Sequence, residues 1–300
     1  MDRLEAMSVF LAAVETGSLS AAGRRLDMPL ATVSRKLSEL EAHIRTRLLH
    51  RSTRALTLTE AGQSYLVACK RILEDVEEAE RAAAGEYSVP KGDLIVTAPV
   101  LFGRLHVLPV TTEFLEAYPE VDVRLVLGDR VLNMRDDHVD LAIRIGALPD
   151  SNLIAARVGT IRQVVCGSPA YFARCGTPRR PEDLSKLDCI SFESLTFADH
   201  WKFGAGKSEV SVPVHSRLIV NTADAAIAAA IAGTGVTRAL SYQVADATLA
   251  GALDIVLRGF EPEPWPVSLV YAGQGRLPQK VRAFIDFAAS RLRERLAPTS

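Results

Sequence analysis

The chain has 300 residues, of which 48% are hydrophobic and 24% charged, and its formal net charge is −1. This composition is ordinary for a globular protein, and no apolar run approaches the roughly 18–20 residues of a membrane span, which argues against a disordered or membrane-embedded chain. The length allows two or three domains of roughly 100–150 residues, and the N-terminus lacks a signal peptide, so we expect a cytoplasmic protein.

The charge is unevenly distributed along the chain. Residues 1–58 hold nine Lys or Arg against six Asp or Glu, whereas residues 59–85 hold three against six. A basic N-terminal segment followed by a nearly neutral body indicates local contact with a polyanion.

The cysteines have neither CxxC spacing nor a nearby pair of histidines. The polar cluster at residues 136–140 also lacks the spacing of a metal site, so we expect no metal and no cofactor. We interpret the thiols as reduced and structural, with redox sensing as the less favoured alternative: Cys69, Cys166, Cys175 and Cys189.

Two helices are predicted at the start of the chain. Apolar residues recur at steps of three and four from Leu4 to Val14, and Gly17 follows as a stop signal. Ser18 and Ser20 are candidate caps for a second helix over residues 21–26. The small residues at 21–23 permit close contact between helices.

A third helix is predicted over residues 29–44, with Pro29 in its first position. Its apolar stripe comprises Val33, Leu37, Leu40 and Ile44. The opposite face has no acidic residue at its N-terminal end, and we expect this face to reach the base edges of DNA, ordinary solvated surface being the alternative. Its candidate residues are Pro29, Leu30, Ala31, Thr32, Ser34, Arg35 and Lys36.

Residues 48–51 and 55–58 are predicted to form two short strands of a wing, joined by a basic turn. Arg51 and Arg54 would lie beside phosphates or in the minor groove. Lys36 and the backbone amides near Ser18, at the start of the second helix, complete the predicted phosphate contacts. These contacts would hold the register without reading sequence.

A long helix is predicted from Thr59 to Gly85. Tyr65, Cys69, Ile72, Val76, Ala79 and Ala83 recur at alternating steps of four and three. A seam with this period favours a partner helix and therefore a dimer. Packing against the chain's own body is the alternative.

After a short linker at residues 87–92, predicted strands alternate with predicted helices, which indicates an α/β body. Strands are expected at 94–97, 121–127, 141–145, 162–166, 190–192, 216–220 and 267–271. Helices are expected around 103–117, 169–175, 224–232, 242–249 and 278–295.

Enzyme motifs are missing from the sequence. Gly206-Lys207-Ser208 imitates the end of a phosphate-binding loop, but Trp201 stands where the first glycine is needed. Gly233-Thr234-Gly235 has no third glycine and follows a helix instead of a strand. No GxSxG or HExxH motif appears, so we expect a protein that is not an enzyme.

The chain resembles the LysR-type transcriptional regulators over essentially its whole length. In the N-terminal part the resemblance rests on the segments at 10–14, 17–22, 31–35, 40–41 and 56–62, which read FLAAV, GSLSAA, ATVSR, LE and LTLTEAG. In the body it rests on the segments at 114–121, 140–146 and 233–236, which read FLEAYPEV, DLAIRIG and GTGV.

The resemblance implies a winged helix-turn-helix domain over 1–58, a linker and dimerisation helix with hinge over 59–91, and an effector-binding domain over 92–300. The body would have two α/β lobes like type 2 periplasmic binding proteins, lobe one being 92–161 with 266–300 and lobe two 162–265. By similarity, a small effector between the lobes would meet Ala98, Pro99, Val100, Leu101, Phe102, Asp129, Arg144, Ile145, Gly146, Phe197, Trp201, Asn221, Thr222, Thr237 and Arg238.

The chain departs from the family pattern at three places. Pro29-Leu30 replaces a frequent Ser-Gln before the recognition residues, Leu240-Ser241 replaces a frequent Leu-Pro, and Leu101 stands where many relatives have a polar residue. The base preference and the effector pose of the family are therefore the properties least safely assigned to this chain by resemblance.

Two assignments in the body have alternatives. Arg144 suits a bound carboxylate and equally an internal ion pair. We interpret the aromatic residues Phe102, Phe197 and Trp201 as core or cleft wall in preference to a stacking site.

We predict a regulator that binds double-stranded DNA as a homodimer or tetramer and responds to a small effector, such as a carboxylic acid with an apolar part. A solute-binding receptor with a vestigial N-terminal domain and an α/β enzyme are the rival hypotheses.

Overall fold

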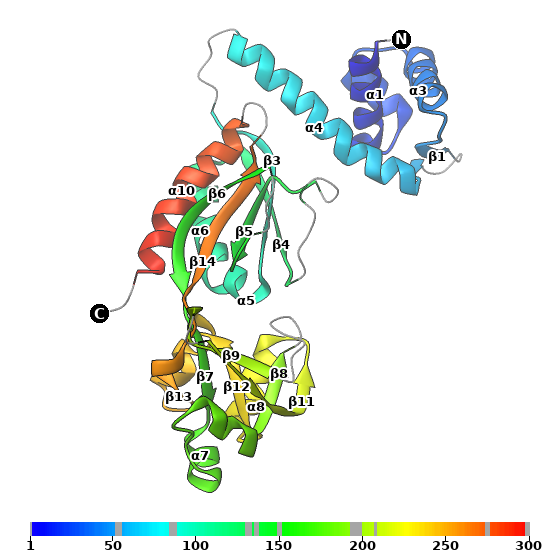
Figure 1. Cartoon of the computed structure of the whole chain (residues 1–300). Helices are drawn as coiled ribbons and strands as arrows, with labels where there is room; N and C mark the ends of the chain where they lie inside the picture. Colours follow the sequence, from blue (N-terminus) through cyan, green and yellow to red (C-terminus); the bar gives the residue numbers. More distant parts are fainter. Residues whose placement is uncertain are drawn as a thin grey trace. The chain divides into compact units, whose positions relative to one another are not determined.

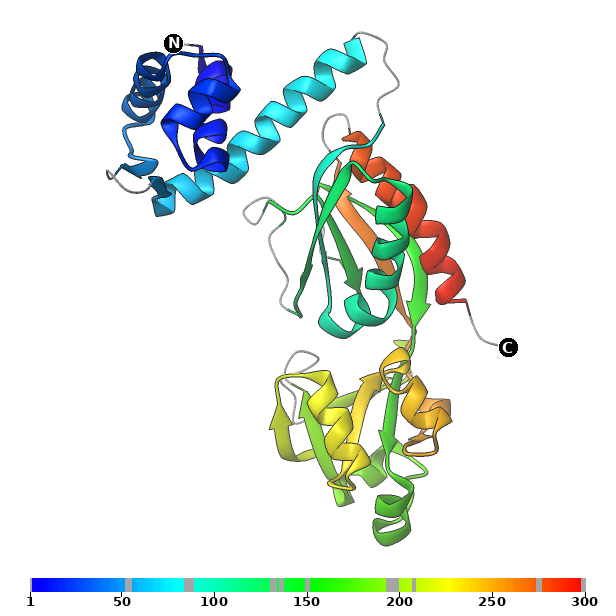
Figure 2. The same cartoon turned by 180° about the vertical axis from the view of Figure 1, so that it is seen from behind.

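The computed structural model describes residues 2–51, 56–83, 89–129, 134, 138–148, 152–192, 200–206, 209–273 and 277–297. The chain divides into two compact units, Met1–Ser88 and Val89–Ser300. Figures 1 and 2 show from opposite sides that the first unit is mainly helical and that the second combines helices with sheets. The predicted fold class is confirmed.

The N-terminal unit begins with α1, whose first turn is capped by Asp2: its carboxylate accepts hydrogen bonds from the backbone N–H groups of Leu4 and Glu5. The helix ends at Gly17 with φ of 65°, as predicted from the sequence. The elements of this unit are α1 (Arg3–Thr16), α2 (Leu19–Arg25), α3 (Leu30–Ile44), β1 (Leu49–Arg51), β2 (Leu56–Leu58) and α4 (Glu60–Ala83).

The core of the N-terminal unit is built around the apolar stripe of α3. Val33, Leu37 and Leu40 are buried as predicted, and they pack with α1 residues that include Val9 and Phe10. Pro29 is the N-cap of α3 and not its first helical residue, so the predicted start is wrong by one position.

The apolar seam of α4 is packed in its first part and more exposed in its later part. Tyr65 and Cys69 pack within the N-terminal unit, where the Tyr65 and Phe10 rings lie 5.7 Å apart between centroids. Farther along the helix Ile72 and Val76 are half-buried, and the remaining small seam residues are exposed. The prediction that the whole seam meets a partner helix is therefore wrong for its first part.

The wing is fixed to α3 and α4 through the backbone groups of Leu48 and Leu49. The Glu41 carboxylate on α3 accepts hydrogen bonds from the N–H groups of Leu48 and Leu49, at 2.9 and 3.2 Å. At the start of α4 a Cβ on Gly62 would lie 2.0 Å from the Leu48 carbonyl oxygen. Only glycine permits this approach of helix and strand.

The second unit contains two five-stranded sheets, ordered β4-β3-β5-β14-β6 in lobe one and β11-β8-β12-β7-β13 in lobe two. Lobe one has β3 (Gly92–Ala98), α5 (Val100–Phe102), the π-helix η1 (Gly103–Val107), α6 (Leu108–Ala117), β4 (Val121–Leu127), β5 (Leu141–Ile145), β6 (Leu153–Ile161), β14 (Trp265–Ala272) and α10 (Gln279–Arg295). Strands β3, β4 and β5 run parallel, and β14 pairs antiparallel with β5 and β6.

Lobe two has β7 (Gln163–Gly167), α7 (Pro169–Cys175), η2 (Pro181–Lys186), β8 (Asp188–Phe192), β9 (His200–Phe203), β10 (Val210–Pro213), β11 (His215–Val220), α8 (Ala223–Ile231), β12 (Val236–Leu240), η4 (Ser241–Gln243), α9 (Ala245–Leu249), β13 (Asp254–Val256) and η5 (Arg258–Phe260). Each strand and helix predicted for the body is present close to its expected place. Strands β6, β9, β10, β12 and β13 were not predicted.

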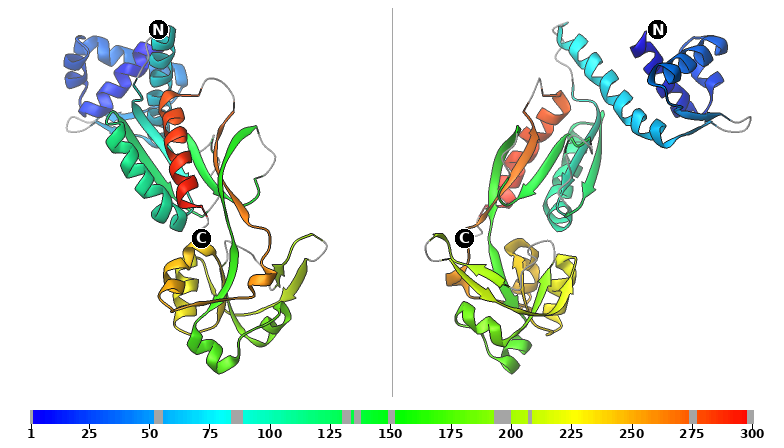
Figure 3. Two further views of the ribbon diagram at one scale, coloured as in Figure 1. Left: turned by 90° about the vertical axis from the view of Figure 1, so that its left-hand side faces the viewer. Right: turned by 45° about the vertical axis from the view of Figure 1, so that its right-hand side comes forward.

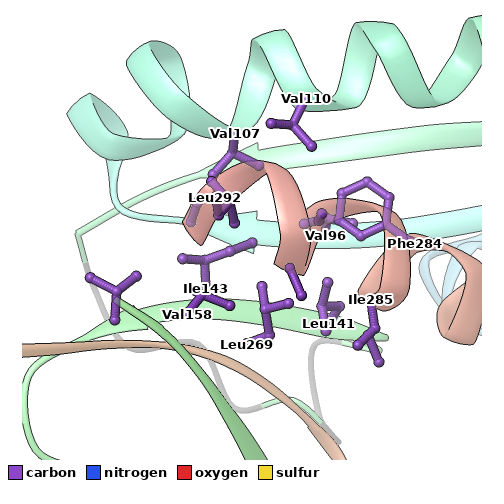
Figure 4. Close-up of a cluster of buried hydrophobic side chains, with 14 of the residues drawn as sticks. Val96, Val107, Val110, Leu141, Ile143, Val158, Leu269, Phe284, Ile285 and Leu292 are labelled. Carbon is purple, nitrogen blue, oxygen red and sulfur yellow. The ribbon is translucent and has the colours of Figure 1, made fainter. Parts of the chain in front are cut away.

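The core of lobe one lies between its sheet and the helices α6 and α10. Figure 4 shows Val107 and Val110 from the α6 side and Phe284 and Leu292 from α10 facing strand residues such as Ile143. All five side chains are essentially inaccessible to solvent. Their burial holds the two helices on one face of the sheet.

Two crossing segments join the lobes, as Figure 3 shows for the green and orange strands. One passes from β6 through Arg162 into β7, and the other returns from lobe two into β14, where Trp265 pairs with Ile161. The Arg162 guanidinium donates to both carboxylate oxygens of Glu261, at 2.9 and 3.1 Å. This ion pair ties the two crossings together.

The contact at Gly62 gives a test of the N-terminal fold. We expect Gly62→Ala to lower the free energy of unfolding by about 2 kcal/mol or more, because the new methyl group overlaps the Leu48 carbonyl. Urea denaturation followed by circular dichroism measures the change. Ser64→Ala, at an exposed site on the same helix, is the control and should change stability little; equal losses in both variants would contradict the packing described.

Candidate functional site

The N-terminal end of α3 forms an exposed surface, which we call the α3 surface. Pro29, Leu30, Ala31 and Arg35 are exposed, and the other members are half-buried. The structure thus brings together the residues predicted to reach base edges: Pro29, Leu30, Ala31, Thr32, Ser34, Arg35 and Lys36.

The tight turn between α2 and α3 fixes the position of the α3 surface relative to α2. The N–H of Met28 donates to the Gly23 carbonyl at 2.8 Å, and Asp27 adopts φ of 51° to make the turn. A Cβ on Gly23 would lie 2.7 Å from the Met28 carbonyl oxygen. Of the small residues at 21–23, which were predicted to permit close contact between helices, Gly23 is the one that allows the α2–α3 turn to pack so closely.

Two basic residues of the α3 surface have acidic partners. Arg35 pairs with Glu39 at 2.8 Å, and Lys36 pairs with Glu5 of α1. The first turn of α3 has no acidic residue, as predicted, and these two carboxylates come from the second half of α3 and from α1. The Arg35 side chain is 63% exposed, so its pair with Glu39 is weak and can be exchanged for another acceptor, whereas Lys36 is 15% exposed and held inside the fold.

The structure describes only some of the residues predicted to contact phosphates. The Ser18 hydroxyl caps α2 by accepting from the Ala21 N–H at 3.5 Å. Arg51 ends β1 with its backbone opposite Leu56, and Arg54 lies outside the described residues.

In lobe one the predicted effector residues follow the ends of three parallel strands. Ala98 ends β3, Asp129 lies two residues beyond β4, and Arg144, Ile145 and Gly146 occupy the end of β5 and the residue after it. Parallel strands present their carboxyl ends at one edge, which is where open α/β sheets bind ligands. The structure therefore gathers these residues at a single edge.

The start of the helix after β3 is already occupied by a carboxylate. Pro99 caps α5, and the Val100 N–H donates to the Asp129 carboxylate at 3.1 Å. Val100 is 40% exposed, whereas Leu101 and Phe102 are buried in lobe one.

Arg144 is half-buried on β5, opposite Ser268 of β14. Burial leaves the guanidinium poorly solvated and lowers its pKa from the usual value. Gly146 follows with φ of 103°, and its N–H donates to the Pro266 carbonyl at 2.9 Å. The strand end is thereby joined to the second crossing segment.

Three predicted residues of lobe two are satisfied inside that lobe. Thr237 donates its hydroxyl to the Ile190 carbonyl at 3.0 Å. The Arg238 guanidinium lies 5.6 Å from the centroid of the buried Trp201 ring and donates to the Lys202 carbonyl. Burial lowers the pKa of Arg238 to about 10.

The remaining predicted residues of lobe two separate into two groups. Asn221 and Thr222 are exposed just after β11, where the Thr222 hydroxyl caps α8 by accepting from the Ala225 N–H. Phe197 lies outside the described residues.

An aromatic contact joins the lobes and combines the predicted effector residue Phe102 with His106 and Tyr242, which were not predicted as site residues. The Tyr242 ring of lobe two lies 5.4 Å from the rings of both Phe102 and His106 of lobe one, in edge-to-face arrangements. Burial raises the pKa of Tyr242, and the carboxylates of Asp129 and Asp224 add to that effect. The strand ends of the two lobes therefore face each other here.

His106 is the titratable member of that contact. Its Nε2 is buried and has no hydrogen-bond partner among the described residues. Burial lowers the pKa of the imidazole from 6.5, and the charge of Arg295 lowers it further.

A hollow of about 580 Å³ lies elsewhere, on the surface of α6 and α10. It is lined by Glu113, Ser290, Arg291, Glu294 and Arg295, and Arg291 pairs with Glu113 at 2.6 Å. Arg295 also pairs with Glu113, at 3.6 Å, and none of the predicted effector residues borders the hollow.

No three His, Cys, Asp or Glu side chains among the described residues converge to hold a metal ion. No single helix within the described ranges is long and apolar enough to cross a membrane, although α1 and α2 together pass such a test across a 117° bend.

Two family models match the chain. The model described as bacterial regulatory helix-turn-helix protein, lysR family, matches residues 4–63, and the LysR substrate binding domain matches residues 88–293. The chain is a LysR-type transcriptional regulator. Such regulators combine a DNA-binding helix-turn-helix with an effector-binding domain, and the α3 surface and the facing strand ends lie in these two parts.

Curated relatives agree with this assignment. An HTH-type transcriptional regulator of Xanthomonas campestris pv. campestris (strain 8004) is 36% identical over 95% of this chain and 84% of its own. The HTH-type transcriptional activator AaeR of Escherichia coli (strain K12) is 32% identical over 95% of this chain and 93% of its own.

Among solved structures, CrgA from Neisseria meningitidis, a LysR-type regulator, matches with a TM-score of 0.61 and 28% identity over 96% of this chain and 98% of its own. AphB, a virulence activator of Vibrio cholerae, matches with a TM-score of 0.60 and 26% identity over the same shares.

The environment of His106 predicts how the regulator's stability depends on pH. Because the folded pKa lies below the unfolded value of 6.5, the unfolded chain takes up the proton first as pH falls. The free energy of unfolding should therefore decrease below pH 6.5 because of this residue. Urea midpoints at about pH 7.5 and about pH 5.5 measure the loss.

His106→Phe keeps a ring between Phe102 and Tyr242 but removes the titration. The variant should lose less stability than the unmodified chain over the same pH interval. An identical loss in both proteins would contradict the assignment to His106.

Proposed function

We propose that this regulator reads operator DNA with the α3 surface and responds to a small effector bound where the strand ends of its two lobes face each other. The observation that carries the first part is the exposure of Leu30, Ala31 and Arg35 at the start of α3, beside basic residues in the last turn of α2. A helix end of this kind can enter the major groove and contact base edges with its first residues.

The regulator acts as a dimer or a tetramer in this proposal. The later seam residues on α4, beginning with Ile72 and Val76, are not fully buried within the N-terminal unit and are available to a second copy. Two copies would present two α3 surfaces to an inverted repeat with half-sites about one helical turn apart, or multiples of it.

The polar groups at the strand ends of lobe one indicate which chemical groups an effector would carry. Asp129 already accepts the hydrogen bond of the Val100 N–H, so a carboxylate on the effector would pair with Arg144 and not with that helix end. The exposed Val100 side chain would meet an apolar part of the same molecule. We therefore favour a small carboxylic acid with an apolar part.

Effector binding would change the angle between the lobes. The two crossing segments are the hinge, and the paired Arg162 and Glu261 would move with them. Closure by an effector that binds the closed form better would shift the population of dimer geometries and so the spacing of the α3 surfaces. The relatives include a repressor in Pseudomonas aeruginosa and an activator in Escherichia coli, so either regulatory sign is compatible with this mechanism.

Arg35→Ala tests the α3 surface. We expect a loss of about tenfold or more in affinity for an operator fragment taken from the DNA upstream of the gene, because an arginine contact to a base is removed. Fluorescence anisotropy measures it. Arg217→Ala is the matched control, because this arginine is equally exposed and also ion-paired but lies on β11. Unchanged affinity in Arg35→Ala would contradict the proposal.

The same assay separates the regulator from the rival hypotheses. Affinity should fall by about 10³–10⁵ between 50 and 200 mM salt if six to ten phosphates are contacted. A solute receptor with a vestigial N-terminal unit, or an enzyme, would instead keep its ligand binding or turnover in the combined Arg35→Ala and Arg54→Ala variant and would show no DNA retention at the outset.

Arg144→Gln tests the effector site. Calorimetric titration with a panel of small carboxylic acids should find binding that weakens about tenfold or more in this variant, because a charge-assisted hydrogen bond is lost. Arg124→Gln, at an exposed arginine on β4, should leave the affinity unchanged. Tight binding confined to small hydrophilic sugars would contradict the proposed effector class.

A further inference from the structure

Leu30 is an exposed leucine at the first position of α3. Its side chain is 50% accessible, more than the other large apolar side chains exposed in the described part of the N-terminal unit, Leu4 at 40% and Val67 at 37%. The neighbouring Pro29 and Ala31 are exposed as well. The three residues form a continuous apolar patch at the end of the helix that faces DNA in the proposed function.

Basic groups border this patch. Arg24 and Arg25 are in the last turn of α2, directly before the turn into α3, and Arg35 follows one helical turn later. Arg25 and Arg35 pair with exposed carboxylates, which are weak partners that a phosphate can replace. A cationic border is complementary to a polyanion and unfavourable for an apolar protein partner, so the patch fits DNA.

The floor of the major groove offers only one apolar group. Thymine carries a 5-methyl group there, whereas guanine, adenine and cytosine present hydrogen-bond donors or acceptors at the corresponding edges. A leucine side chain has no polar atom, so placing it against those edges would bury donors or acceptors without partners. Against thymine, the same side chain buries a methyl group.

We propose that Leu30 is a specificity-determining residue that reads the 5-methyl group of a thymine in each half-site of the operator. This rests on the proposed function, in which the α3 surface enters the major groove. The small Ala31 beside Leu30 allows the backbone of the helix end to approach the bases closely. The base preference of this regulator therefore comes partly from a van der Waals contact in addition to hydrogen bonds.

The test begins with operator sequences selected by the full chain from a random duplex library. In a selected duplex, each thymine is replaced in turn by uracil, which differs only by the missing 5-methyl group. We expect one position per half-site at which the affinity falls about fourfold, and about fifteenfold when both half-sites of a dimer are changed, because one buried methyl group is lost at each.

Exchange of the same thymine–adenine pair for cytosine–guanine should also weaken binding. Methylation of that cytosine at its 5-position should then restore part of the affinity, since it returns the methyl group to nearly the same place in the groove. A duplex in which methylation restores nothing would contradict the contact.

Protein variants assign the methyl contact to Leu30. Leu30→Ala should bind thymine and uracil duplexes equally, whereas Leu30→Met should keep the preference for thymine. Thr32→Ser removes the methyl group of Thr32 from the α3 surface and should also keep the preference. Val67→Ala, at an exposed apolar residue of α4, should leave both the affinity and the preference unchanged.

The outcomes separate this inference from the proposed function. If no sequence is enriched, the α3 surface does not read DNA, and both proposals are wrong. If a sequence is enriched but uracil is tolerated at every half-site thymine, the role of Leu30 alone is overturned. Retention of the thymine preference in Leu30→Ala, with its loss in Thr32→Ser, would likewise overturn it.

Discussion

The close approach of α2 and α3 at Gly23 determines where the exposed N-terminal end of α3 lies. With no side chain at this position, the chain turns back within a few residues, and the Met28 backbone lies directly over α2. The buried stripe of α3 then fixes the rotation of the helix, so that Leu30 and Arg35 remain on the outside. The wing depends on a second contact of the same kind, at Gly62.

In the effector-binding unit, the direction of the strands determines where the predicted site residues lie. In lobe one, parallel pairing brings Asp129 and Arg144 to one edge although they come from different connections. In lobe two the parallel strands β8, β11 and β12 do the same for Thr222 and Tyr242. The contact of Tyr242 with Phe102 shows that the two edges face each other. A ligand at this place could touch both lobes, which is the requirement for coupling its binding to a change in their angle.

Much of this arrangement could be predicted from the sequence, because local signals mark it. The periodic stripe of α3, the stop at Gly17 and the alternation of strands and helices in the body each predicted an element that the structure contains. The strands that were missed have weaker signals. β12 contains Thr237 and Arg238, whose polar groups are satisfied only by contacts with distant segments. β6 follows no simple alternation of burial along its length, and its chain continues directly into the segment that crosses to lobe two.

For the site residues too, features set by the local sequence could be predicted, whereas contacts between distant segments could not. Exposure of the α3 surface follows from helix geometry and could be predicted. The pair of Arg35 with Glu39 follows from the same geometry, because the two residues are one helical turn apart. The partner of Lys36 could not be predicted, because Lys36 pairs with Glu5, which is 31 residues away in the chain. The inward orientation of Arg238 and the aromatic contact of Tyr242 with His106 also depend on tertiary packing, and nothing in the local sequence marks them.

In the proposed function the exposed end of α3 lies in the major groove. Dimethyl sulfate methylates guanine at N7 in the major groove and adenine at N3 in the minor groove, so protection patterns distinguish the two directly. We expect the bound regulator to protect guanine N7 in two major-groove segments on one face of the duplex, about one helical turn apart or multiples of it. Protection confined to adenine N3, with every guanine N7 still reactive, would contradict it.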